Sequence, residues 1–146
     1  MGGGYVSCGD FSGDDKSCSA LKGVLEQIAE LPTYHPSPEL RQLVNRMAAF
    51  LSGGGDSEWT DYLLIPPPQA LELERYLEEC RRTLIADLGT ADPYEGIEID
   101  AKVPSLDPID AKWGMGKGWR LYCITDLLLA IGHSRAQNED ICVAFD

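Results

Sequence analysis

Acidic and basic side chains alternate with apolar ones between Ile97 and Val103, and their types could serve metal-dependent chemistry. Strict alternation indicates a strand with one dry and one wet face. The wet face would carry Glu98, Asp100 and Lys102, so two carboxylates could hold a magnesium ion beside a lysine that positions a phosphate. With Asp92, these residues predict a magnesium-dependent hydrolase or nuclease site.

Two observations count against that interpretation. The acid, acid-x-lysine pattern loosely resembles the one in restriction-type nucleases, but the same triplet recurs at Asp110-Ala111-Lys112, so it arises easily in this composition. A nuclease also needs basic residues to hold phosphates, and Lys102 stands alone among the acids of this segment. The metal-dependent enzyme is therefore the alternative hypothesis.

A glycine-rich loop precedes the most apolar part of the chain and reads Gly114-Met115-Gly116-Lys117-Gly118. Backbone amides and a lysine at the start of a helix can bind an anion, which would suit a nucleotide-binding regulator. The loop is not a Walker A motif, because no Ser or Thr follows Lys117 and the glycine spacing differs. We favour a tight turn between Trp113 and Trp119, in which the two indoles cover the core.

The cysteines and histidines do not form a recognisable catalytic or metal-binding pattern. A nucleophile–base pair such as Cys123 with His35 has no local support, and no spacing fits a zinc site. We expect the free thiols to act as small core hydrophobes in a reducing compartment, with no cofactor and no metal. The five cysteines are Cys8, Cys18, Cys80, Cys123 and Cys142.

Negative charge is concentrated in the stretch Ala86–Asp110, which holds seven acidic residues against one lysine in a chain of net charge −12. Carboxylates steer a cationic partner and pair with its arginines, while aromatic side chains supply desolvated anchors. The alternative is that the acids merely keep the protein in solution. The predicted partner-binding residues are Asp92, Tyr94, Glu95, Glu98, Asp100, Asp107, Asp110, Trp113 and Trp119.

The elements that would position these residues begin with helices. Apolar residues recur at the helical period after Ser17 or Ser19, and Pro32 ends that segment. The remaining helices are expected from Pro38 to the glycines at 53–55, from the last residues of Pro66–Pro68 to Gly89, and from Trp119 to a stop at Gly132 and the polar run up to Asp140. A strand over Trp119–Cys123 is the alternative at the last position. The first two helices should form a hairpin.

Strands are expected at Tyr5–Cys8, as a short edge strand, at Ile97–Val103 and at Ile141–Phe145. The segment Trp59–Ile65 is ambiguous between a strand and a helical turn. A chain of 146 residues has the size of one domain. We therefore predict a single α+β domain over residues 1–146, with about four helices packed on a small, mostly antiparallel sheet.

Hydropathy and charge also bear on location and partner. We see no secretory signal and no apolar run long enough to cross a bilayer, so we expect a cytoplasmic protein. The acidity disfavours contact with nucleic acid or an anionic membrane. The favoured function is a non-enzymatic immunity- or antitoxin-type inhibitor, of bacterial or phage origin, that neutralises a basic toxin or nucleic-acid-acting protein by direct binding.

Overall fold

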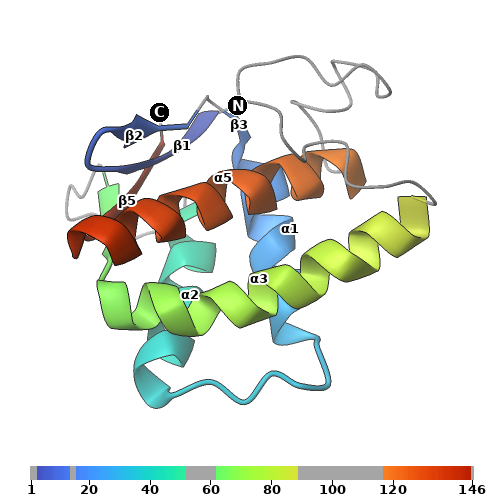
Figure 1. Cartoon of the computed structure of the whole chain (residues 1–146). Coiled ribbons are helices and arrows are strands. Elements are labelled where there is room, and N and C mark those ends of the chain that lie inside the picture. The colour runs from blue at the N-terminus through green and yellow to red at the C-terminus, as the bar shows by residue number, and fades with distance from the viewer. Residues whose placement is uncertain (1–2, 14–15, 52–61, 89–116, 146) are drawn as a thin grey trace.

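The helices of the chain are long and carry most of its core. The structure is a computed structural model that describes residues 3–13, 16–51, 62–88 and 117–145. Within these ranges the helices are α1 (Cys18–Ala29), α2 (Pro38–Leu51), α3 (Pro67–Leu88) and α5 (Lys117–Gln137) (Figure 1).

The start of α2 shows how the sequence specifies a helix. The Oγ of Ser37 accepts a hydrogen bond from the Leu40 amide at 3.2 Å, which caps the helix, and Pro38 occupies its first position. Glu39 lies in the first turn, where a negative charge opposes the positive end of the helix dipole. The buried face repeats at the helical period and consists of Leu40, Leu43, Val44, Met47, Phe50 and Leu51.

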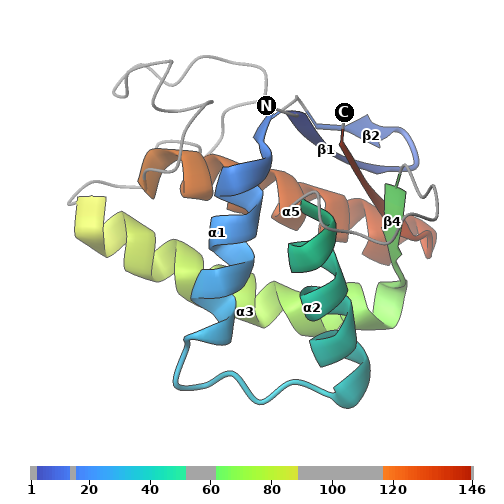
Figure 2. The same cartoon turned by 180° about the vertical axis from the view of Figure 1, so that it is seen from behind.

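The helices pack in two pairs. Helices α1 and α2 form the predicted hairpin, while α3 and α5 run antiparallel and make the most extensive contact between helices (Figures 1 and 2). Near the C-terminal end of α5, the guanidinium of Arg135 bonds the carboxylate of Glu74, close to the N-terminal end of α3. This ion pair links the two helices at that end.

The strands form an antiparallel sheet beside the helices, near the C-terminal half of α5 (Figure 1). Its order is β2-β1-β5-β4, and β3 also pairs with β1. On one face, Val6, Val143 and Leu63 lie on neighbouring strands and are buried against the helices. The bounds of the strands are β1 (Gly3–Cys8), β2 (Phe11–Ser12), β3 (Lys16–Ser17), β4 (Tyr62–Ile65) and β5 (Ile141–Phe145).

Buried residues from the helices and from the inner face of the sheet form one hydrophobic cluster. Its largest fully buried side chain is Tyr76 of α3, and Leu121 and Ile124 of α5 are also fully buried. The predicted α+β class, with its four helices and mostly antiparallel sheet, is therefore confirmed for the part of the chain described.

Some of the expected element details differ from the structure. Tyr5–Cys8 was expected at an edge, but β1 lies between β2 and β5, because its long-range pairing with the C-terminal strand is invisible to local patterning. The last helix was expected to end over Gly132 and the polar run up to Asp140; α5 passes through Gly132 and ends within that run, at Gln137. The next residue is Asn138, whose φ of 54° is the left-handed conformation common after a helix C-terminus.

The ambiguous segment before the third helix contains β4, so its last four residues are a strand. The alternative strand over Trp119–Cys123 is wrong, because these residues are helical. The expected strand Ile97–Val103 lies outside the described residues.

Candidate functional site

The predicted partner-binding residues lie almost entirely outside the described part of the chain. Trp119 belongs to the first turn of α5, and nothing further is described of its side chain. The hypothetical magnesium site falls in the same undescribed range, residues 89–116. Residues outside the description are Asp92, Tyr94, Glu95, Glu98, Asp100, Lys102, Asp107, Asp110 and Trp113, together with Gly114–Gly116 of the glycine-rich loop.

The described framework is nearly neutral. It holds twelve acidic and ten basic residues, whereas the whole chain holds 24 and 12. Twelve acidic residues and two lysines therefore belong to the segments outside it, six of these acids and both lysines to residues 89–116. Helix α3 illustrates this balance, since Glu78 pairs with Arg81, the arginine three residues on, at 3.7 Å.

One carboxylate was missed by sequence reasoning. Asp126 has no exposed surface and lies in the middle of α5, within an otherwise apolar run. Its side chain lies against the backbone of Gly13, where a Cβ would come within 2.8 Å of the Asp126 Cγ. The Gly13 amide donates a hydrogen bond of 2.8 Å to the Val6 carbonyl, so this turn is held against β1. A lone acid inside an apolar helical segment was the available signal.

A polar cluster fastens the α1–α2 connection to α3. The amide and hydroxyl of Ser37 both donate to the Glu72 carboxylate, at 2.7 Å and 2.6 Å. Thr33 donates to Glu79 at 2.5 Å, and Tyr34 packs edge-on against Tyr76 with ring centroids 5.2 Å apart. Burial raises the pKa of the Tyr34 phenol. These contacts attach the α1–α2 connection to α3.

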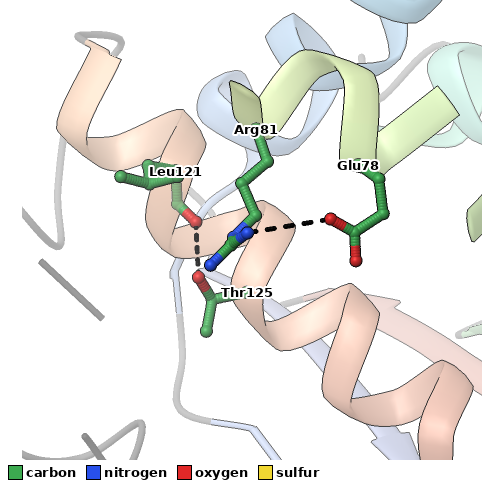
Figure 3. A network of polar contacts seen from close by, with 4 residues as sticks. All are labelled: Glu78, Arg81, Leu121 and Thr125. Atoms are coloured by element: carbon green, nitrogen blue, oxygen red, sulfur yellow. Dashed lines mark hydrogen bonds and ion pairs between the residues drawn. The ribbon is translucent and has the colours of Figure 1, made fainter. Parts of the chain in front are cut away.

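The contacts around Arg81 lie between α3 and α5 (Figure 3). The guanidinium of Arg81 reaches toward α5 near Thr125, while the Thr125 hydroxyl donates to the Leu121 carbonyl at 2.9 Å. Arg120, one residue before Leu121, donates to the Gln27 side chain of α1 at 3.0 Å. Arg120 therefore connects α5 to α1.

The four cysteines whose side chains the structure describes are buried or half-buried. Cys8, Cys80 and Cys123 are buried, and Cys142 is half-buried. Burial, assisted by the nearby Glu79 carboxylate, raises the pKa of the Cys80 thiol to about 11. Burial also raises the pKa of Cys8. A nucleophile needs the thiolate at neutral pH, and these shifts act in the opposite direction.

The second histidine of the chain is His133. It lies within α5, and its ring stacks on Phe11 of β2 with centroids 5.3 Å apart. Among the described residues, no group of three or more His, Cys, Asp or Glu side chains is arranged to hold a metal ion. No helix in those ranges is both long and apolar enough to span a bilayer.

The outer face of the sheet carries Tyr62 and Leu64, two of the exposed large apolar side chains among the described residues. Cross-strand partners share a face, so the register sets Tyr5, Ala144 and Tyr62 in one row. The adjacent row is Ser7, Cys142 and Leu64. Tyr62 is 52% exposed and Leu64 is 44% exposed, while the other four are half-buried. We call these six residues the outer sheet face.

Comparison with known proteins adds no relative: no family model, no curated protein and no solved structure matches the chain.

Proposed function

We propose that the protein is a non-enzymatic binding protein that neutralises a basic protein by direct contact, as an immunity- or antitoxin-type inhibitor does in the cytoplasm. The observation that supports this function is the uneven distribution of charge. The described framework is nearly neutral, and the excess of acidic residues belongs to a few segments of the sequence. Acidic residues that served only solubility could be spread evenly along the sequence.

Concentrated negative charge affects both the rate of association and the choice of partner. Clustered carboxylates raise the rate of encounter with a cationic surface and repel nucleic acid, which would otherwise compete for the same partner. Aromatic residues within the same stretch, Tyr94 and Trp113, can supply the desolvated contacts that slow dissociation. The proposed partner is a basic toxin or another protein that acts on nucleic acid.

The test compares two variants that lose the same number of negative charges. In the first, residues of the predicted surface are neutralised: Asp92→Asn, Glu95→Gln, Glu98→Gln and Asp100→Asn. In the control, framework acids are neutralised: Glu26→Gln, Glu30→Gln, Glu39→Gln and Asp140→Asn. Each protein is used to capture partners, and the captured protein is purified for stopped-flow measurement of association.

We expect the association rate of the wild type and of the control to fall steeply between about 50 and 500 mM salt, because the encounter is electrostatic. The first variant should associate at least tenfold more slowly at low salt. Equal rates for the two variants, or a rate that is independent of salt, would contradict the proposed function.

A further inference from the structure

The outer sheet face differs from the usual outer surface of an antiparallel sheet. Such a sheet commonly packs one face on the core and presents polar residues on the other. Here none of the six side chains carries a formal charge, and the two most exposed are Tyr62 and Leu64. The helices pack against the opposite face, through residues such as Val143 and Leu63 (Figures 1 and 2).

The outer sheet face is continuous across three neighbouring strands. Its two rows run across β1, β5 and β4 in an uninterrupted register, and side chains directly opposite each other lie about 4.5–5.5 Å apart at Cβ. Tyrosine supplies large contact area with few rotatable bonds, and it is enriched where proteins bind each other. Leu64 adds an aliphatic side chain beside it.

The net charge of the chain indicates which kind of occupant suits the outer sheet face. Two copies of the chain would each bring a net charge of −12, so association between copies is opposed by repulsion. In the sequence, Asp61 directly precedes Tyr62, and Asp146 directly follows Phe145. An apolar surface on a protein of this charge favours an occupant that is apolar and cationic.

We infer that the outer sheet face is where the cationic partner docks, with an apolar segment of that partner packed on Tyr62, Leu64 and Tyr5. This inference rests on the proposed function and refines it. It adds apolar anchors on the sheet to the aromatic residues of the acidic stretch.

The test uses labelled ten-residue peptides as probes. One alternates leucine with lysine, a second alternates serine with lysine, and a third alternates leucine with glutamate. Fluorescence anisotropy measures their dissociation constants for the full chain at about 50 mM salt. The variant Tyr62→Thr/Leu64→Thr keeps β-forming residues in β4 but removes the apolar surface. The control Leu71→Gln/Leu129→Gln removes two leucines that are 46% and 41% exposed on α3 and α5.

We expect the leucine–lysine peptide to bind at least tenfold more tightly than either other peptide. The Tyr62→Thr/Leu64→Thr variant should lose that advantage, while the control should stay within about twofold of the wild type. Amide hydrogen exchange should show protection in β4 and β5 on binding.

Several outcomes would overturn the inference. If the two lysine peptides bind equally to every variant, charge alone is recognised, and the proposed function stands without a docking role for the sheet. If no peptide binds, the sheet inference fails, while the capture experiment still decides the proposed function. If ultracentrifugation shows a wild-type dimer that Tyr62→Thr/Leu64→Thr dissociates, the occupant is a second copy.

Discussion

Replacing Gly13 by alanine tests the close approach between the β2–β3 segment and the buried carboxylate of α5. The added Cβ would lie within 2.8 Å of the Asp126 Cγ and 3.0 Å of the Val6 carbonyl oxygen. Ordinary contacts begin near 3.4 Å, so something must move. Asp126 has no exposed surface, and its side chain therefore cannot swing into solvent. Overpacking of this kind costs about 1–3 kcal/mol.

The expected cost can be divided between the two neighbours of the new methyl group. If Asp126 causes most of the clash, removing its carboxylate in an Asp126→Ala background should relieve it. Gly13→Ala should then cost less than about 1 kcal/mol, because only the contact with the Val6 carbonyl remains. The coupling energy between the two substitutions should exceed about 1 kcal/mol, as is usual for residues in contact.

Urea unfolding followed by circular dichroism at pH 7 gives the free energy of unfolding for each member of this cycle. Gly132→Ala provides the matched control, because a Cβ there meets nothing within 4 Å and the glycine lies in the interior of α5. It should stabilise the protein by about 0.5–1 kcal/mol. The reasoning is refuted if Gly13→Ala costs the same in both backgrounds, or if both glycine substitutions have the same sign.

Three further predictions concern the cap of α2, the buried thiol and the divalent ion. Ser37→Ala removes the hydroxyl that caps α2 and donates to Glu72, while the amide bond to Glu72 remains, so it should lower the free energy of unfolding by about 1–2 kcal/mol in thermal or urea unfolding, whereas Ser37→Thr should retain most of it. The Cys80 thiol has its pKa raised to about 11, so the stability it contributes is complete below about pH 9 and is lost as the pH rises through about 11. Because one pKa unit corresponds to about 1.4 kcal/mol, the advantage of the wild type over Cys80→Ala should shrink by on the order of 2–3 kcal/mol between pH 8 and pH 12, and a constant difference would contradict the assignment. Finally, a binding protein should show no magnesium-dependent rise in melting temperature, and a rise that Asp100→Asn abolishes would favour the hydrolase alternative instead.

The helices could be predicted from the sequence because their determinants are local. Ser37 and Pro38 specify the start of α2 within three residues, and the apolar period of α1 and α3 identifies their buried faces without reference to the rest of the chain. The thiols of Cys80 and Cys123 were likewise recognisable as core residues from their positions in apolar periodic segments.

Sequence by itself therefore determined the α+β class, the helix positions and the excess of negative charge. The tertiary structure decided that β1 is internal, that Gly132 lies within a continuous helix, and that Asp126 approaches Gly13. It also decided that Tyr62 and Leu64 share an exposed face with Tyr5. The position of β1, the approach of Asp126 to Gly13 and the shared sheet face depend on contacts between segments far apart in the chain, which the local spacing of residues does not encode.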